Sequence, residues 1–407
     1  MKIIFLRRNI QFLFLILIFS FLFYGFLDSL FFRIRICDGY AMGDWLINFQ
    51  DGGFKRRGLS GELILWLSDI TGLYIGKIVF GINLIFYTLF FLISAFFISS
   101  FQWTKYHILL IMFPTTFFFM LNDQYAVGRK EILLFTLFVS FLYYFKNKIF
   151  LSWRITICLV LILNFLVFLH ELVLFFVPYF LIVPYVVSRE NKVKIPYLKM
   201  FVIIFSVILS SLIIFLFGGD LNQGGTWRLL QSYGMNEMVM GGILSWPKEG
   251  FSGDKINAIA FAKLHSYWRY VIPFVVTLLL VFRIIVNFKF QTITIKTALL
   301  VVAGLFLFSF PLFYLTIDWG RWLHIHFIML LLLVFYFSEN VIERSVWDEL
   351  KSINFRKKMV YLFLCLLIPL ILFLFTMRHV EEGSKLGLSE TYLELKQVYY
   401  NFLELIR

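Results

Sequence analysis

The segment that decides the fold is the N-terminus, Met1-Lys-Ile-Ile-Phe-Leu-Arg-Arg8, which leads into the apolar run Phe12–Phe32. About 20 mainly apolar residues are enough to span a bilayer as a helix. No small-residue cleavage site follows the run, so we expect a retained first helix rather than a signal peptide. Arg7 and Arg8 precede the run, and positive residues favour the cytoplasmic side of a membrane, so we expect the N-terminus in the cytoplasm.

The composition extends this interpretation to the whole chain. Of the 407 residues, 61% are hydrophobic, 15% are charged and 54 are phenylalanine. A soluble domain is roughly 45–50% apolar and about 25% charged. We therefore expect an all-α, polytopic integral membrane protein. The net charge of +13 is consistent with basic cytoplasmic loops, so we expect no nucleic-acid partner. Two of the three cysteines lie in apolar runs, which leaves no intramolecular disulfide framework.

About eleven apolar segments are candidate spanning helices, and we expect them to form a single transmembrane domain over residues 1–407. The candidates are Phe12–Phe32, Leu73–Ser99, His107–Leu121, Glu131–Phe145, Ile155–Leu169, Leu172–Val187, Met200–Phe217, Tyr270–Val286, Thr297–Ile317, Leu323–Phe337 and Met359–Met377. One straight helix over 155–187 would be about 50 Å long, so we divide it at His170-Glu171. Without this division, every later loop would change sides.

The loops that this topology places on the cytoplasmic side are short and basic, whereas most acidic residues fall on the outward side, in the segments 33–71, 122–131, 218–269 and 318–324, at Glu171 and in the tail 379–407. The longest outward segment contains Gly224-Gly-Thr-Trp-Arg228. A long loop in a compact protein is usually functional. The tail 379–407 has the pattern of an amphipathic helix, with Thr391 and Glu394 at capping-box spacing.

The outward segments also carry basic residues, which runs against the usual distribution of charge, so we expect an anionic ligand to compensate for them. Arginine suits phosphate because its planar guanidinium can donate two parallel hydrogen bonds. The candidate substrate-binding residues are Asp51, Arg56, Arg57, Arg129, Lys130, Arg228, Arg321 and His324. The structural alternatives are a solvated turn or a pair with Asp51 for Arg56-Arg57, and snorkelling at a helix start for Arg129-Lys130.

The candidate catalytic residues are His170, Glu171 and Asp318. His170-Glu171 lies between apolar flanks, and ionisable residues at membrane depth usually mark function, although a hydrogen-bonded structural pair is the alternative. Asp318 and Arg321 have the spacing of a helical ion pair. His324 and His326 are two residues apart and would point to different sides of a helix, so we predict no metal site.

One stretch carries a family resemblance. It runs from Gly128-Arg129-Lys-Glu-Ile-Leu-Leu-Phe, through Phe141-Leu-Tyr-Tyr-Phe-Lys-Asn-Lys148, to Phe168-Leu-His-Glu-Leu-Val-Leu-Phe-Phe-Val-Pro178. It resembles bacterial O-antigen and exopolysaccharide polymerases of the Wzy and EpsG type, in which an Arg opens a helix and a Phe-x-His motif follows. Arg129 and His170 occupy those positions here. Glu171 departs from the pattern, because the family usually has a small residue after the His.

The resemblance implies a GT-C-like helical bundle in the bacterial inner membrane with its active site facing the periplasm. Such enzymes transfer a growing glycan from undecaprenyl pyrophosphate onto another lipid-linked repeat unit. They need no cofactor, and their partners are the lipid-linked oligosaccharide, membrane lipid and a chain-length regulator protein. Cations would stabilise the leaving pyrophosphate. A base would accept the proton of the acceptor hydroxyl; His170 or Glu171 is expected in that role, with Asp318 next.

Two other functions remain open from the sequence. A GT-C type glycosyltransferase that uses a polyprenyl-phosphate sugar often has an acid in its first outward loop, and Asp38, Asp44 or Asp51 would fit. A transporter of lipid-linked oligosaccharides is the alternative from a different class, but such proteins typically show two similar halves, which are not evident here. A membrane O-acyltransferase finds no matching motif.

Overall fold

The computed structural model describes residues 2–51, 53–123, 126–219, 222–241, 244, 270–287, 294–315 and 318–338. Within these ranges the chain is helical, and its only β feature is an isolated bridge between Lys55 and Gly219. The all-α prediction is therefore confirmed for this part of the chain. The predicted span Met359–Met377, the tail 379–407 and most of the segment 218–269 lie outside the described residues.

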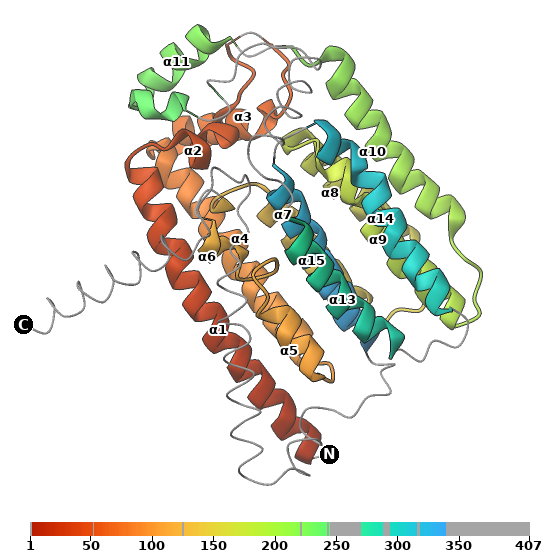
Figure 1. Cartoon of the computed structure of the whole chain (residues 1–407). Helices are drawn as coiled ribbons and strands as arrows, with labels where there is room; N and C mark the ends of the chain where they lie inside the picture. Colours follow the sequence, from red (N-terminus) through yellow and green to blue (C-terminus); the bar gives the residue numbers. More distant parts are fainter. Residues whose placement is uncertain are drawn as a thin grey trace, which may run out of the picture.

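Six of the described helices are long and apolar enough to cross a membrane. They are α1 (Lys2–Arg35), α4 (Ile75–Ser99), α9 (Val173–Glu190), α10 (Tyr197–Phe217), α14 (Ile295–Leu315) and α15 (Trp319–Phe337). Three shorter apolar helices accompany them, α7 (Glu131–Phe145), α8 (Trp153–Leu169) and α13 (Val271–Val286). Their length and composition are those of a membrane-embedded helical bundle (Figure 1).

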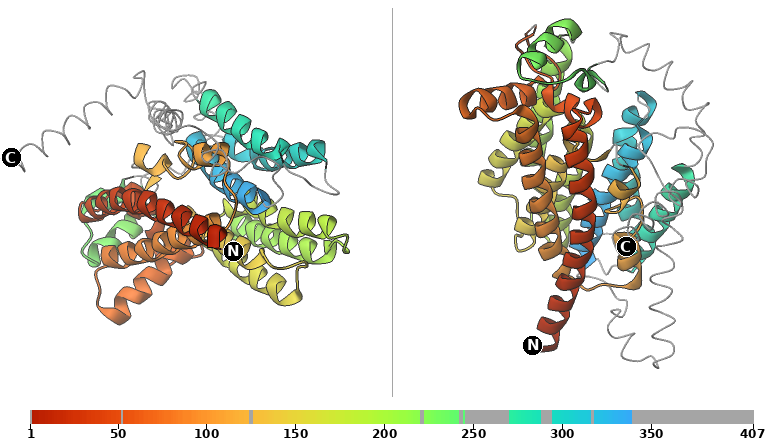
Figure 2. Two further views of the ribbon diagram at one scale, coloured as in Figure 1. Left: turned by 90° about the horizontal axis from the view of Figure 1, so that it is seen from below. Right: turned by 90° about the vertical axis from the view of Figure 1, so that its left-hand side faces the viewer.

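Helix α15 forms the centre of this bundle. In the 18-residue apolar stretch of α15, 94% of the residues are buried, whereas the corresponding share is 17% in α10 and in α14. Helix α1 packs on α4, α4 on α7, and α7 on α15, while α8 packs on α10 at the other side. Figure 2 shows the same arrangement from below and from the side. A helix that is apolar all round must be covered either by protein or by lipid, so α15 lies in the protein core and α10 and α14 face lipid.

The predicted span His107–Leu121 is wrong. The structure has instead a short helix α5 (Lys105–Ile111), a run of turns, and the single turn α6 (Phe119–Asn122). Pro114 disfavours helical geometry in the residue before it. The Thr116 hydroxyl also lies within hydrogen-bond distance of the carbonyl oxygens of Leu110 (2.7 Å), Phe113 (2.9 Å) and Ile111 (3.1 Å), so its single hydrogen can satisfy one of the acceptors at the end of α5. An apolar run was therefore not enough to make a helix here.

The predicted division at His170-Glu171 is confirmed. Helix α8 ends at Leu169 and α9 begins at Val173, with His170 in an extended conformation between them. The Lys130 ammonium donates to the carbonyl oxygen of Leu169 at 3.0 Å, so one of the open acceptors at the end of α8 is satisfied by a charged donor. The break brings the side chains of His170 and Glu171 to one end of the bundle.

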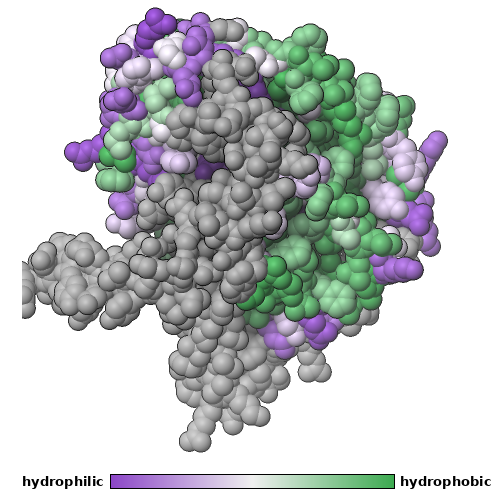
Figure 3. Space-filling view, turned by 45° about the horizontal axis from the view of Figure 1, so that its top comes forward, coloured by the Kyte–Doolittle hydropathy of each residue, from purple (hydrophilic) through white to green (hydrophobic). Residues whose placement is uncertain are grey.

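Three further helices lie at that same end. The segment 33–71 contains α2 (Gly39–Leu46) and α3 (Gly58–Thr71), and the beginning of the long segment contains α11 (Gln223–Ser232). Hydrophilic side chains gather over this end, while hydrophobic ones cover the flank of the bundle (Figure 3). The polar segments predicted to face outward thus meet at one end, as an alternating topology requires.

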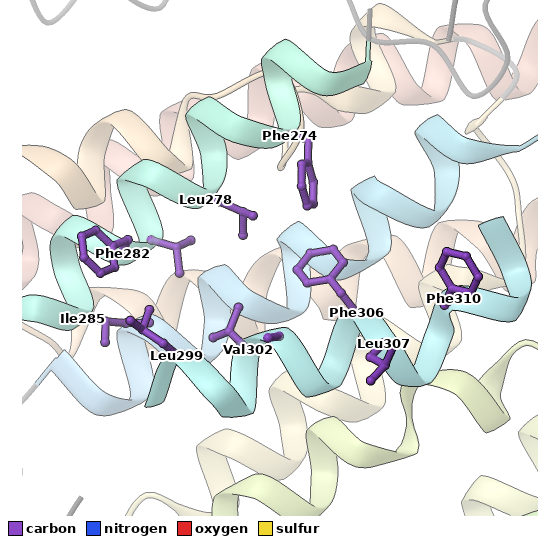
Figure 4. A pocket seen from close by; sticks show the side chains of 11 residues that line it. Phe274, Leu278, Phe282, Ile285, Leu299, Val302, Phe306, Leu307 and Phe310 are labelled. Carbon is purple, nitrogen blue, oxygen red and sulfur yellow. The ribbon is translucent and has the colours of Figure 1, made fainter. Parts of the chain in front are cut away.

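A cavity of about 500 Å³ lies between α13 and α14. Its lining is apolar throughout and includes Phe274, Phe282, Phe306 and Phe310 (Figure 4). Such a lining offers hydrocarbon-like surroundings and no group that could accept a proton or bind a charge. Ionisable side chains lie instead at the charged end of the bundle.

Candidate functional site

Charged side chains from five separate parts of the sequence meet at the end of the bundle that carries α2, α3 and α11. They come from α2, from the turn before α3, from the start of α7, from the break between α8 and α9, and from the start of α15. We call this group the ion network; its members are Asp44, Arg56, Arg57, Arg129, Lys130, Glu131, His170, Glu171, Asp318 and Arg321. Eight of the ten are candidate residues of the sequence analysis.

Arg57 holds two carboxylates at once. Its Nε lies 3.0 and 2.9 Å from the two carboxylate oxygens of Glu171, and its Nη2 lies 2.6 Å from Oε1 of the same group. Its Nη1 donates to Oδ1 of Asp44 at 3.1 Å. Burial raises the pKa of each carboxyl, but the neighbouring cations prevail: Arg57 and Arg56 keep the pKa of Glu171 well below its usual value, and Lys130 and Arg57 do so for Asp44. Both groups are therefore ionised at neutral pH.

The backbone before α3 is shaped to present Arg57. This residue has a φ of 64°, in the left-handed region that non-glycine residues seldom adopt. The following Gly58 packs so closely on Phe49 that a Cβ atom there would lie 2.3 Å from the ring, and a Cβ on Gly61 would lie 2.2 Å from the carbonyl oxygen of Ile47. The two glycines let the first turn of α3 lie against residues 47–49, and this contact fixes the direction of the Arg57 side chain.

Lys130 connects α7 to both neighbouring segments. Its ammonium group is 3.0 Å from the carbonyl oxygen of Leu169 and 3.7 Å from Oδ2 of Asp44, and it lies over the ring of Trp45. The indole of Trp45 in turn donates to the carbonyl oxygen of Gly128 at 2.6 Å. Burial lowers the pKa of Lys130 to about 8, although Asp44 acts in the opposite direction. Lys130 is thus a cation with little access to water.

Arg321 joins the remaining members. Its Nε donates to Glu131, its Nη1 is 3.2 Å from Oδ2 of Asp318, and its Nη2 is 3.2 Å from Nε2 of His170. Nη1 of Arg129 is 4.0 Å from the same Asp318 oxygen. The predicted ion pair between Asp318 and Arg321 is therefore confirmed. Glu131 was not a predicted site residue, although its place beside Arg129-Lys130 at a helix start was a usable signal.

His170 lies between Glu171, which Arg57 holds, and Arg321. Nδ1 is 3.3 Å from the backbone nitrogen of Leu172 and 3.8 Å from Oε2 of Glu171, and Nε2 faces Arg321. Both ring nitrogens face an N–H donor, Nδ1 that of Leu172 and Nε2 that of Arg321, and a neutral imidazole has one lone pair, so it accepts from one of them at a time. Burial lowers the pKa of His170 well below its usual value, and Arg57 and Arg321 lower it further. The imidazole is uncharged at neutral pH.

Three predicted substrate-binding residues lie outside the ion network. Asp51 pairs with Lys55 and accepts a hydrogen bond from Thr226 of α11. Arg228 is exposed on α11, and its Nε donates to the carbonyl oxygen of Gly224 at 3.3 Å. His324 is buried in the bundle, 3.0 Å from the carbonyl oxygen of Thr115.

Asp44 is a different case, because the sequence analysis named it for the alternative glycosyltransferase, and the structure places it inside the network. No group of three His, Cys, Asp or Glu side chains suited to a metal ion is found among the described residues. His326 contacts the hydroxyls of Tyr179 (2.7 Å) and Ser309 (2.6 Å) inside the bundle.

The ion network combines five cationic side chains with four carboxylates, and the buried carboxylate of Asp123 also acts on Arg129, so the charges nearly balance while His170 is neutral. The cavity next to Lys130, Glu131 and His170 is only about 10 Å³, room for at most about one water molecule. Arg56 is the exception to this close packing, since 58% of its side chain is exposed and its Nε is 3.5 Å from Glu171. An anionic ligand would meet Arg56 first and compete with the carboxylates for the other cations.

Comparison with known proteins identifies no relative: no family model, no curated protein and no solved structure matches the chain. The features that point to a function are therefore the chemistry of the ion network and its place at the end of a membrane-embedded bundle.

Proposed function

We propose that this protein is a membrane glycosyltransferase, an O-antigen or related surface-polysaccharide polymerase. It would transfer an undecaprenyl-pyrophosphate-linked glycan onto a lipid-linked repeat unit at the periplasmic face of the bacterial inner membrane. The observation that carries the proposal is the ion network, in which five cations and the neutral His170 are gathered at one end of the bundle. The resemblance of residues 128–178 to the Wzy and EpsG type points to the same reaction.

The cations suit a pyrophosphate leaving group. Breaking the bond between sugar and pyrophosphate leaves negative charge on the departing oxygen, and fixed cations stabilise that charge in the transition state. Arg56, with its exposed guanidinium, would take the outermost phosphate. Arg129 and Arg321 lie beside Asp318 deeper in the network and would take the inner one. A pyrophosphate would thus replace carboxylates that now balance these side chains.

His170 is the best placed base for the acceptor hydroxyl. Glu171 is held by Arg57 and Asp318 by Arg321, so their carboxylate oxygens already accept hydrogen bonds from guanidinium groups. The imidazole of His170 is uncharged, and its Nε2 faces Arg321 while its Nδ1 faces the backbone N–H of Leu172. If Arg321 turns toward the phosphate, Nε2 becomes free to accept a proton. Substrate binding and activation of the base would then be one event.

Deletion of the gene in its host tests this function directly. The expected result is a lipopolysaccharide or capsule gel that keeps the band for a core bearing one repeat unit and loses the ladder of longer chains. The wild-type gene on a plasmid is the control and restores the ladder. An unchanged ladder in the deletion strain contradicts the proposal.

A second candidate is favoured by Asp44. A GT-C type glycosyltransferase that uses a polyprenyl-phosphate sugar would need an acid from its first outward loop, and Asp44 meets Arg57 and Lys130 inside the network. Purified protein in lipid vesicles distinguishes the two. Transfer from a polyprenyl-phosphate sugar with no turnover of the pyrophosphate-linked repeat unit supports the second candidate, and the opposite pattern supports the polymerase.

A further inference from the structure

Helix α3 presents three distinct faces along its 14 residues. Ile64 and Leu65 are buried against the rest of the protein, and they belong to the face that packs on α4 and α8. A second face is apolar but exposed: Leu63, Trp66 and Ile70 keep 36%, 56% and 64% of their surface accessible. Residues spaced by three, four and seven positions share one side of a helix, so these three side chains form one continuous stripe.

The third face of α3 is polar and is partly covered by hydrogen-bonding partners. Asp69 accepts a hydrogen bond from the hydroxyl of Tyr233, just beyond α11, at 2.8 Å. Glu62 accepts from the side-chain amide of Gln50 at 3.3 Å and from the backbone nitrogen of Phe49 at 3.4 Å. The polar face therefore looks toward α11, while no described residue covers the apolar stripe beside it in this way. This division is typical of helices that lie in a membrane interface.

The position of α3 matches the level at which the lipid-facing surface ends. The last residues of α10, Phe215 to Phe217, are about 70% exposed, as expected for side chains in lipid. Gly219, two residues further on, donates its backbone N–H to the carbonyl oxygen of Phe54 at 2.8 Å and bridges Lys55. Helix α3 begins three residues after Lys55, so it starts where the hydrophobic surface of α10 stops. It then runs across the end of the bundle rather than along it (Figure 2).

We propose that α3 is a membrane-interface helix, whose stripe of Leu63, Trp66 and Ile70 lies among the phospholipid headgroups and upper acyl chains at this end of the bundle. Tryptophan is the residue best suited to that layer because its ring is amphipathic. The inference does not depend on the proposed function. It also places Arg56, two residues before α3, at the depth of the lipid phosphates, so that an anionic headgroup reaches the ion network by lateral diffusion within the membrane.

Spin labelling in lipid vesicles tests the inference. Cys37, Cys158 and Cys365 are first replaced by alanine, and single cysteines are then introduced as Trp66→Cys and Ile70→Cys. Leu212→Cys on the exposed side of α10 is the lipid control, and Arg228→Cys on α11 is the water control. In phosphatidylethanolamine and phosphatidylglycerol vesicles, labels at 66 and 70 are expected to collide more with oxygen than with a water-soluble nickel chelate, as at 212. The label at 228 should show the reverse.

Two outcomes overturn the inference. Labels at 66 and 70 that match 228 would place the stripe in water, and labels shielded from both reagents would place it under protein. A second measurement avoids the cysteine-free background: vesicles with lipids brominated near the glycerol should quench the fluorescence of the wild-type protein by a larger fraction than that of Trp66→Phe. Equal fractional quenching contradicts the proposal.

Discussion

Arg57 donates three hydrogen bonds to Glu171, at 2.6, 2.9 and 3.0 Å, although the two residues are 114 positions apart in the chain. The pair connects the turn before α3 to the break between α8 and α9. A planar guanidinium that meets a carboxylate in this way gives direction as well as energy. The interaction therefore fixes how the first polar segment sits on the bundle.

Glu171→Gln is expected to destabilise the protein. The substitution keeps the shape of the side chain but removes the charge that balances Arg57. Breaking a buried pair by neutralising one partner costs about 3–5 kcal/mol, and the partial exposure of Glu171 puts the expected loss at the lower end. Thermal unfolding of the purified protein in detergent measures it. Arg228→Gln, on an exposed side chain, is the control and should unfold like wild type; an unchanged midpoint for Glu171→Gln would refute a stabilising pair.

Arg129→Ala and His170→Ala should abolish the long glycan chains if the proposed function holds. Loss of a cation at the leaving group is expected to slow transfer about 10²–10³-fold, and loss of the base about 10²–10⁴-fold. Complementation of the deletion strain, followed by a glycan gel and an immunoblot for protein level, provides the measurement. Arg228→Ala is the matched control, because its arginine lies outside the ion network. A full ladder from either network variant at normal protein level rules out the assigned roles.

The stability of the protein should fall as the pH drops below about 6.5. In the unfolded chain His170 takes up a proton near that pH, whereas its pKa in the folded protein is lowered well below it by burial and by Arg57 and Arg321. The unfolded state then binds more protons, which destabilises the fold by up to about 1.4 kcal/mol per pH unit.

His170→Gln removes this titration and keeps an acceptor for Arg321. Unfolding of both proteins at pH 7.5 and 5.5 measures the difference. The wild type should lose more stability than the variant, and equal losses would show that His170 is protonated in the folded state. The carboxyls Glu171 and Asp44 contribute equally in both proteins, because their unfolded pKa values lie near 4.

Asp44→Asn and Asp51→Asn separate the two candidate functions. Asp44 belongs to the ion network, whereas Asp51 pairs with Lys55 and Thr226. The polymerase proposal predicts that Asp44→Asn lowers activity less than His170→Ala does, because Asp44 would only position Arg57 and Lys130. A glycosyltransferase with Asp44 as its base predicts the opposite order. Initial rates in vesicles, normalised to folded protein, decide between them, and Asp51→Asn should stay near wild type in both cases.

The sequence predicted the helices best where an apolar run is bounded by charge. The predicted limits Glu131–Phe145 agree with α7, and the division at His170 agrees with the end of α8. The run His107–Leu121 failed because hydropathy carries no information on the hydrogen bond that Thr116 makes with a carbonyl oxygen at the end of α5. Local composition thus predicts which segments are apolar, but not always where the backbone stays helical.

The ion network could be predicted only in outline. An alternating topology is enough to bring the outward segments to one end, and eight network members were candidates for that reason. The individual pairs were not predictable, since Arg321 and Glu131 are 190 positions apart and meet through the packing of α15 on α7. Asp44 and Asp51 lie in the same segment and yet have different partners, because Asp44 belongs to α2 while Asp51 lies beyond its end, where it meets Lys55 and Thr226 of α11.

The ion network is built from helix ends: the starts of α7, α9 and α15 and the last carbonyl of α8. Each residue added to a helix turns its end by about 100° and moves it by about 1.5 Å. One residue inserted or deleted within these helices would therefore carry a charge out of the cluster altogether. The connections at the opposite end of the bundle, around 146–152 and 191–196, contribute no member of the ion network, so their length does not set the position of its charges. Changes of length in this protein should be tolerated on one side of the membrane and not on the other.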